Sequence, residues 1–182
     1  MDSELKALVE QARRDLPYNT RAFEAIAARQ YRGIRGFAMS MIGDRDAADT
    51  ITQDVLMRVM HGLPRLEEAD RFPAWLARIT TNVTRSHLAR ERREREKYHS
   101  YSQERDWESQ DEAQAGPSFR ELIAGLSEIE KTIVSLKILQ DFEFNQIAEV
   151  TGLGISAAKM RYYRALEKIR SRTGGEADPP EQ

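Results

Sequence analysis

A polar stretch in the middle of the chain limits the folds that this sequence can adopt. Residues 90–97 read RERREREK and contain no apolar side chain, and residues 103–114 read QERDWESQDEAQ before the Gly116–Pro117 pair. Because a packed core needs apolar side chains, we expect residues 96–117 to form a flexible linker between two domains. Each domain is then near the lower end of the usual size range, with a small core and much solvated surface.

The residues before this linker predict four helices. Apolar side chains recur at helical spacing over residues 3–15, 20–43, 44–62 and from 71 to about 90. Thr20 and Asp44 stand where N-caps belong, and Pro17 and Gly43 stand where helices end. We expect Trp75 to belong to the core of this unit and not to act as a stacking platform.

The residues after the linker predict four shorter helices and a tail. We expect helices over residues 119–125, from Ser127 through Ile138, over 143–151 and over 155–171, with a tight turn at Gly152-Leu153-Gly154. Ser127 and Glu130 have the spacing of a capping box. Residues 173–182 are expected to be disordered. The predicted fold is all-α, with two small helical domains, 1–95 and 118–172, joined by a flexible linker at 96–117.

The composition gives no support for an enzyme. The chain has no cysteine, so thiolate metal sites and disulfides are excluded, and its three histidines, His61, His87 and His99, lack metal-ligand spacing. No glycine-rich phosphate-binding loop occurs. We therefore expect no catalytic residue, no metal and no cofactor.

The sequence contains no signal for the membrane. No run of about 18 apolar residues is present, as a membrane-spanning helix would require. The first residues, Met-Asp-Ser-Glu, lack the basic start and apolar stretch of a secretory signal. We therefore expect a cytoplasmic protein that is not itself inserted in a membrane.

Charge is distributed unevenly along the chain. The formal net charge is −2, from 28 Lys and Arg against 30 Asp and Glu. Residues 153–172 carry six basic residues and one acidic residue, a local charge of +5, whereas residues 44–70 carry three basic and seven acidic residues, a local charge of −4. A basic helix after a short helix and a glycine-containing turn is typical of a helix-turn-helix, whose second helix enters the DNA major groove. The acidic segment complements a basic protein better than DNA. Each segment is also compatible with a solvated helix face.

Three segments, in order, resemble the extracytoplasmic-function group of bacterial RNA polymerase sigma factors. ADTITQDVL at 48–56 resembles the region 2 helix that docks on the polymerase, and FPAWLARITTN at 72–82 resembles the promoter-melting segment. Ile147-Ala148-Glu149, Gly152 and Lys159-x-Arg161-x-x-Arg164-Ala165 resemble region 4. The resemblance covers about residues 20–95 and 117–172.

The resemblance implies an alternative sigma factor that directs promoter-specific transcription initiation. Its partners would be promoter DNA, the clamp helices and flap of core RNA polymerase, and an anti-sigma factor that can hold the protein at the membrane. The residues implied are Asp49, Gln53 and Asp54 for polymerase binding, Arg78, Asn82, Arg85, Arg90, Arg92 and Arg93 for the minus-ten element, and Ser156, Lys159, Arg161, Arg164 and Lys168 for the minus-thirty-five element.

The sequence departs from the family pattern at three places. Thr50 stands where most members carry Asp, and Glu143 stands where Ser or Thr usually opens the helix-turn-helix. Residues 154–158, GISAA, replace the usual Ser-x-x-Thr-Val start of the recognition helix. The promoter sequence that this chain prefers therefore cannot be transferred from the family.

Two other functions are compatible with a basic helix-turn-helix or with small helical domains. A conventional regulator would bind duplex DNA as a dimer and would leave the basic stretch from Arg78 to Arg95 unused. A protein-binding module, such as an antagonist of an anti-sigma factor, would not need the basic helix. Asn82 has an ordinary interpretation as well, as an exposed polar residue of a helix.

Overall fold

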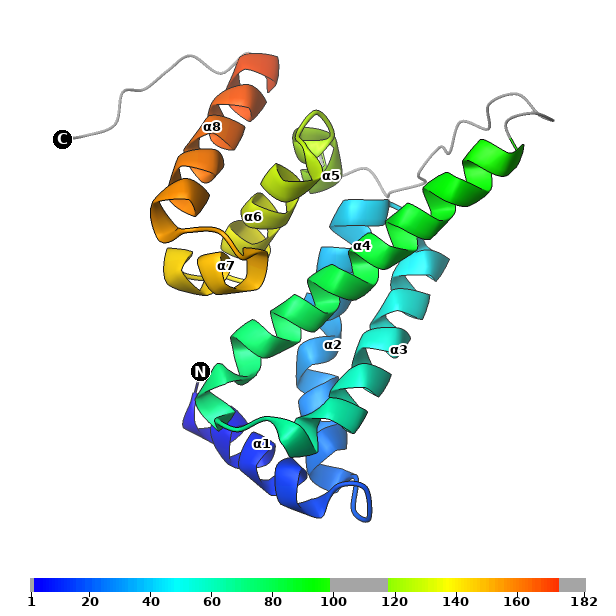
Figure 1. Ribbon diagram of the computed structural model, residues 1–182, viewed down its shortest axis with the longest axis vertical. Coiled ribbons are helices and arrows are strands. Elements are labelled where there is room, and N and C mark those ends of the chain that lie inside the picture. Colours follow the sequence, from blue (N-terminus) through cyan, green and yellow to red (C-terminus); the bar gives the residue numbers. More distant parts are fainter. Residues whose placement is uncertain (1, 99–117, 174–182) are drawn as a thin grey trace. The chain divides into compact units, whose positions relative to one another are not determined.

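The computed structural model describes residues 2–98 and 118–173, which fall into two compact units (Figure 1). The first unit contains α1 (Ser3–Asp15), α2 (Arg21–Ile42), α3 (Arg45–Gly62) and α4 (Phe72–Tyr98), with short 3-10 turns η1 (Leu63–Arg65) and η2 (Ala69–Arg71) before α4. The second contains α5 (Phe119–Ile123), α6 (Glu128–Leu139), α7 (Phe144–Thr151) and α8 (Ile155–Thr173). The described residues form no strand, and the predicted all-α class with two helical domains is confirmed.

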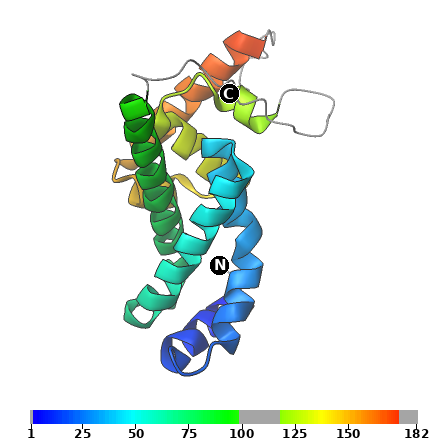
Figure 2. The same cartoon turned by 90° about the vertical axis from the view of Figure 1, so that its right-hand side faces the viewer.

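In the first unit, α2, α3 and α4 lie alongside one another, and α1 packs against α2 and the two 3-10 turns (Figure 1; Figure 2). The apolar positions that recur at helical spacing face inward, as predicted. The core includes Val9, Ile26, Ile34, Ile51, Val55, Val59, Leu63, Phe72 and Val83. Burying an aliphatic or aromatic side chain of this size contributes about 1.5–3 kcal/mol, so this core holds the four helices together.

Two of the helix starts in this unit differ in how they are capped. Asp44 caps α3 as predicted, because its carboxylate accepts a hydrogen bond of 2.7 Å from the backbone N–H of Ala47. The prediction that Thr20 caps α2 through its side chain is wrong, since its hydroxyl donates to Glu24 at 2.6 Å instead. Asn19, one residue earlier, accepts a hydrogen bond of 3.1 Å from the backbone N–H of Arg21.

Exposed ion pairs join α1 to the rest of the first unit. Lys6 lies 2.5 Å from Asp70, and Arg29 lies 2.9 Å from Asp2 and 3.0 Å from Glu4. Because such pairs are solvated, each adds little to stability. The attachment of α1 therefore depends mainly on its buried side chains.

The second unit has a smaller core and more elaborate helix caps. One cluster of its core consists of Ile123, Leu126, Val134 and Ala165, with Phe119, Tyr162 and Ile169 packed against them. Further buried apolar residues include Ile133, Leu136, Ile147, Val150 and Ala158. The predicted capping box is present: Glu130 accepts hydrogen bonds from the backbone N–H and the hydroxyl of Ser127, at 2.9 and 2.7 Å. Ser118 and Glu121 make a second box at the start of α5.

The turn between α7 and α8 follows the sequence prediction. Gly152 has a φ of 72°, in the left-handed region that glycine adopts without steric cost, and ends α7. At the other end of α7, the backbone N–H of Glu143 donates to the side-chain oxygen of Gln146 at 2.9 Å. The backbone N–H of Gln146, to which a Ser or Thr side chain at position 143 would bind, donates to the side-chain oxygen of Asn145 at 2.8 Å.

The end of α4 differs from the predicted domain boundary. The helix continues to Tyr98, inside the range 96–117 that we assigned to the linker. Residues 90–97 lack apolar side chains, but Arg90 pairs with Glu94 and Arg95 with Glu91, and such pairs four residues apart stabilise an exposed helix. The rest of the predicted linker, 99–117, and residues 174–182 of the predicted tail lie outside the described residues. In the part of the chain that the structure describes, no helix is long and apolar enough to cross a membrane.

Candidate protein and nucleic-acid interfaces

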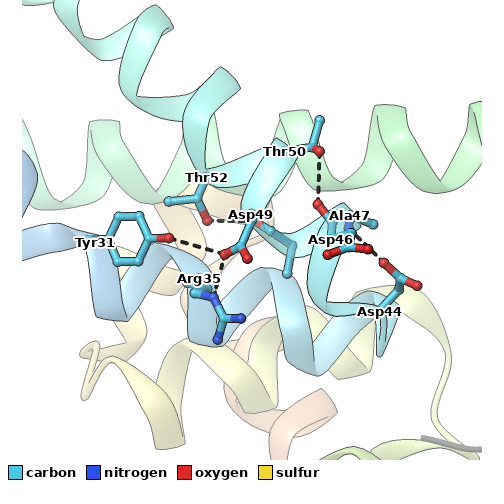
Figure 3. Close-up of polar contacts among 9 residues, drawn as sticks. Tyr31, Arg35, Asp44, Asp46, Ala47, Asp49, Thr50 and Thr52 are labelled. Carbon is cyan, nitrogen blue, oxygen red and sulfur yellow. Dashed lines mark hydrogen bonds and ion pairs between the residues drawn. The ribbon is translucent and has the colours of Figure 1, made fainter.

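Asp49, predicted to bind the polymerase, has partners within the chain. Its carboxylate lies 2.5 Å from the guanidinium Nε of Arg35 and accepts a hydrogen bond of 3.2 Å from the hydroxyl of Tyr31, both on α2 (Figure 3). The hydrogen bond from Arg35 lowers the pKa of Asp49. This cluster ties the first half of α3 to α2, and it holds the carboxylate in its charged form at the surface.

The other two predicted residues on α3 lie free on the surface. Gln53 and Asp54 are exposed and have no hydrogen-bond or ion-pair partner among the described residues. Met57 is about half exposed, at 51% of its maximum, whereas Ile51, Val55 and Val59 of the same helix are buried. Thr50, also exposed, donates its hydroxyl to the carbonyl of Asp46 at 2.9 Å (Figure 3). We call Thr50, Gln53, Asp54 and Met57 the α3 face.

Arg78, Asn82 and Arg85 lie on one side of α4, because their spacing of four and three residues matches the helical repeat. All three are exposed, and none has a hydrogen-bond or ion-pair partner in the described ranges 2–98 and 118–173. We call them the α4 stripe. Two guanidinium groups and an amide without internal partners are suited to phosphate oxygens and base edges.

The arginines farther along α4 have local partners or local bonds. Arg90 lies 3.9 Å from Glu94, and the Nε of Arg93 donates to the carbonyl of Ala89 at 3.2 Å. Arg92 is exposed. Because exposed ion pairs are weak, these groups stay accessible to a ligand, but their charge is partly compensated, unlike that of the α4 stripe.

Trp75 belongs to the core of the first unit, as predicted. It packs against the buried cluster, and its ring centroid lies 6.1 Å from that of Phe72. A Cβ added at Gly62 would lie 2.9 Å from the indole ring, so the end of α3 comes too close to Trp75 for a larger residue. These contacts with Phe72 and with the end of α3 hold the Trp75 ring within the packing of the first unit.

The helix α8 presents its predicted DNA-binding residues to solvent. Ala158 and Ala165 are buried, and Tyr162 and Ile169 pack against the core, which fixes the inward side of the helix. All five predicted minus-thirty-five readers are exposed, and four of them have no ion-pair partner in the described residues: Ser156, Lys159, Arg161 and Arg164.

The fifth predicted reader, Lys168, is also exposed, but it forms an ion pair within the second unit. Its ammonium lies 2.6 Å from the carboxylate of Glu130 on α6, whose side chain is only 8% exposed. Burial raises the pKa of Glu130, but hydrogen bonds from Lys168 and Ser127 outweigh it and lower that pKa to about 2. The nearby Arg172 lies against the turn before α6, since a Cβ added at Gly125 would collide with its guanidinium. Lys168 and Arg172 thus hold α8 in place.

Sequence reasoning did not single out the aromatic and apolar groups on the surface of α8. Met160 and Tyr163 are each 51% exposed. The ring of Tyr163 lies 5.5 Å from that of Tyr162 and 6.4 Å from that of Phe144 on α7. The helical repeat would have placed both on the outer side, given two buried alanines, but the buried positions of this helix were not predicted.

Metal binding finds no support in the described part of the chain, where His, Asp and Glu form no cluster that could hold an ion.

Comparisons with known proteins agree in both halves of the chain. Residues 26–94 match the Sigma-70 region 2 family, and residues 118–169 match the Sigma-70 region 4 family. The chain is 30% identical over 139 residues to the ECF RNA polymerase sigma factor EcfG of Rhodopseudomonas palustris, covering 75% of this chain and 76% of that protein. It is 28% identical to the RNA polymerase sigma factor CarQ of Myxococcus xanthus, covering 84% of this chain and 90% of that protein.

Two solved structures share the fold. One is CnrH in complex with the cytosolic domain of CnrY, with a TM-score of 0.73 and 22% identity over 96% of this chain and 100% of that chain. The other is the sigma factor RpoE in complex with the anti-sigma factor NepR from Bartonella quintana, with a TM-score of 0.72 and 23% identity over 85% of this chain and 98% of that chain. At these identities the likeness concerns the fold.

Proposed function

Since the chain belongs to the extracytoplasmic-function sigma factors of the sigma-70 family, we propose that three separate faces of it perform the steps of promoter-specific initiation. Sigma factors are transcription initiation factors, and their regions 2 and 4 bind core RNA polymerase and promoter DNA. The α3 face and Asp49 bind the polymerase, the α4 stripe binds the minus-ten element, and α8 binds the minus-thirty-five element. The proposed domains are 1–95 and 118–172.

The observation that carries this proposal is the α4 stripe. Arg78, Asn82 and Arg85 are exposed on one side of a helix and have no hydrogen-bond or ion-pair partner in the described residues. Opening a duplex requires cations for the backbone and hydrogen-bonding groups for bases that have left the stack. Arg78 and Arg85 supply the cations, and Asn82 between them supplies donors and an acceptor for a base edge.

The negative charge around the α3 face and its residue types support polymerase binding. Residues 44–70 carry a net charge of −4, which disfavours DNA and complements a basic protein surface. Asp54 and Gln53 are exposed polar groups, and Met57 adds an adaptable apolar side chain among them. Asp49 contributes charge to this face while Arg35 and Tyr31 fix its position.

The outward residues of α8 support binding in the major groove. Arg161 and Arg164 can each bind guanine O6 and N7 or neutralise a phosphate, and Lys159 and Ser156 lie nearer the start of the helix, where groove contacts concentrate in helix-turn-helix proteins. Lys168 is the weakest member of the predicted set, because its ammonium is bound to Glu130.

Two DNA-binding units joined by a linker gain affinity when both are engaged. Binding of one unit raises the effective concentration of the other, and core polymerase would hold the two at the separation of the promoter elements.

An anti-sigma factor is the third proposed partner. One similar structure contains a sigma factor with the anti-sigma factor NepR, and another contains CnrH with the cytosolic domain of CnrY. We expect this chain to act in the cytoplasm and to be held inactive there by a protein of this class.

Run-off transcription with purified core RNA polymerase tests the proposed function. The full-length chain is added to core enzyme with genomic fragments as templates, and the transcript ends are mapped. We expect synthesis from a small set of defined start sites that depend on the added chain. Specific binding to duplex DNA by a dimer, without any start site in the presence of core enzyme, would favour a conventional helix-turn-helix regulator instead.

A further inference from the structure

The side of α8 that faces away from the core carries apolar groups at its centre. The inward line of the helix is Ala158, Tyr162, Ala165 and Ile169, with intervals of four, three and four residues. The same intervals, shifted by two residues, give Ser156, Met160, Tyr163 and Glu167. A shift of two residues is a rotation of about 200°, so this second line lies on the opposite side of the helix. We call it the outward line of α8.

Met160 and Tyr163 are large side chains with apolar surface that the core of the second unit does not bury. Each is 51% exposed, whereas Ala158 and Ala165 on the inward line are buried. Tyr163 is held in place on one side by the rings of Phe144 and Tyr162, at 6.4 and 5.5 Å. Its hydroxyl has no hydrogen-bond partner among residues 2–98 and 118–173. Because neighbouring rings restrain the Tyr163 ring while about half of the side chain stays exposed, this ring is preorganised to contact a ligand.

The basic residues of α8 flank this outward line. Lys159 and Arg164 are exposed beside Met160 and Tyr163 and make no ion pair in the described part of the chain, whereas Lys168 and Arg172 turn toward α6 and the turn before it. A DNA backbone bound by Lys159 and Arg164 would bring the outward line against the base edges. In the major groove, the apolar group among base edges is the 5-methyl of thymine.

We propose that Met160 and Tyr163 are specificity-determining residues that contact thymine 5-methyl groups in the upstream promoter element. This inference rests on the proposed function of α8 as the minus-thirty-five reader. It adds a preference for thymine at the positions facing these two side chains, next to the guanine or phosphate contacts of Arg161 and Arg164.

The experiment replaces thymine by deoxyuridine, which removes only the methyl group. Holoenzyme assembled from core polymerase and the full-length chain first selects binding sequences from a library of promoter duplexes with a randomised upstream segment. Each thymine of the enriched duplex is then replaced in turn, and binding of the holoenzyme is measured. The wild type is expected to lose about fourfold in affinity at one or two upstream positions, the value for one buried methyl group.

Variants assign that loss to the two side chains. Met160→Ala and Tyr163→Ala should each bind the thymine and deoxyuridine duplexes equally at one of these positions. Met160→Leu and Tyr163→Phe, which keep the apolar contact, should retain the wild-type ratio. Ile138→Ala is the matched control: it removes an apolar side chain of similar exposure, 49%, from α6, and the ratio should not change.

The inference is overturned if the wild type binds both duplexes equally at every upstream position, or if both alanine variants keep the wild-type ratio. The selection step separates this from failure of the proposed function. If the holoenzyme enriches no upstream sequence and starts no transcript from the enriched duplex, both the function and the inference are wrong. If the holoenzyme enriches an upstream sequence and starts transcription from it, the proposed function holds. An unchanged thymine-to-deoxyuridine ratio in both alanine variants then contradicts only the assignment of Met160 and Tyr163.

Discussion

The two units of this protein use charged side chains differently. In the first unit a broad apolar core joins the helices, and the α4 stripe of Arg78, Asn82 and Arg85 has no ion-pair or hydrogen-bond partner in the described ranges. In the second unit the core is small, and the buried carboxylate of Glu130 binds Lys168 of the proposed DNA-reading helix. The two proposed DNA-binding helices thus differ in one respect: α8 has a basic residue paired with a buried carboxylate of its own unit, whereas the α4 stripe is unpaired in the described ranges.

The largest expected effect is on the second unit and comes from Glu130→Ala. The substitution removes a capping-box carboxylate and leaves Lys168 without its partner. Because Lys168 is half exposed and can be solvated, we expect a loss of about 2 kcal/mol in the stability of this unit. Hydrogen exchange of α6 and α8 in the full-length chain measures it.

Glu121→Ala is the matched control, since Glu121 makes the same kind of capping box with Ser118 but is exposed and binds no lysine. We expect it to cost about 0.5–1 kcal/mol. Equal losses for Glu130→Ala and Glu121→Ala would show that the ion pair with Lys168 adds nothing to the cap.

Acid should weaken the second unit through the same carboxylate. The pKa of Glu130 is lowered from 4.5 to about 2 in the folded protein, so its contribution is complete above pH 4.5 and is lost as the pH falls toward 2. Hydrogen exchange as a function of pH should show α6 and α8 losing protection over this window, and Glu130→Gln should remove most of this dependence. An unchanged pH profile in that variant would assign the acid sensitivity to other groups.

Arg161→Ala and Arg164→Ala should weaken recognition of the upstream element by about 1–3 kcal/mol each if they contact bases. Binding to core polymerase should not change, because neither residue lies on the α3 face. Arg170→Ala removes the same charge from the same helix outside the predicted set and should have a smaller effect. Holoenzyme binding to the selected promoter duplex measures all three. Normal transcription by both Arg161→Ala and Arg164→Ala would contradict the assignment of α8.

Arg78→Ala and Arg85→Ala should each reduce the slope of the logarithm of the holoenzyme–promoter binding constant against the logarithm of salt concentration. The expected reduction is about that of one lost phosphate contact. Arg90→Ala should have less effect, because its charge is already shared with Glu94. The comparison requires binding constants over a range of salt concentrations. If Arg90→Ala lowers the slope as much as Arg78→Ala does, the distinction between paired and unpaired arginines has no functional meaning.

The smallest expected effect is a gain in stability of the first unit. Gly33 lies in α2, where a methyl group added to it would have nothing within 4 Å, so Gly33→Ala should stabilise the helix by about 0.5–1 kcal/mol. Gly62→Ala is the contrasting variant, since its Cβ would lie 2.9 Å from Trp75, and it should be destabilising. Thermal unfolding followed by circular dichroism measures both. A loss of stability in Gly33→Ala would contradict an open surface at this position.

Most of the fold could be predicted from local patterns in the sequence. Apolar periodicity placed the helices of both units, and Asp44, Gly152 and the Ser127–Glu130 box marked their ends, because these signals depend on neighbours within four residues. Thr20 failed as a cap since Glu24 competed for its hydroxyl. The helix α4 continues past residue 90 without apolar side chains, where ion pairs join Arg90 to Glu94 and Glu91 to Arg95.

The candidate site was predictable in its residue types but not in their partners. Asp49 and Lys168 both matched the family pattern, yet each binds a side chain on another helix: Arg35 lies 14 residues from Asp49, and Glu130 lies 38 residues from Lys168. Such pairs depend on how helices pack, which helical periodicity does not specify. Met160 and Tyr163 were missed for the same reason, because only the buried positions of α8 define its outward line.

The measurement that tests the central claim most directly is promoter affinity of the full-length chain with and without core RNA polymerase. If the polymerase holds the two DNA-binding units at the spacing of the promoter elements, the free chain should bind the selected promoter duplex weakly, and core enzyme should confer tight and sequence-specific binding. Comparable affinity of the free chain and the holoenzyme for that duplex would contradict the account.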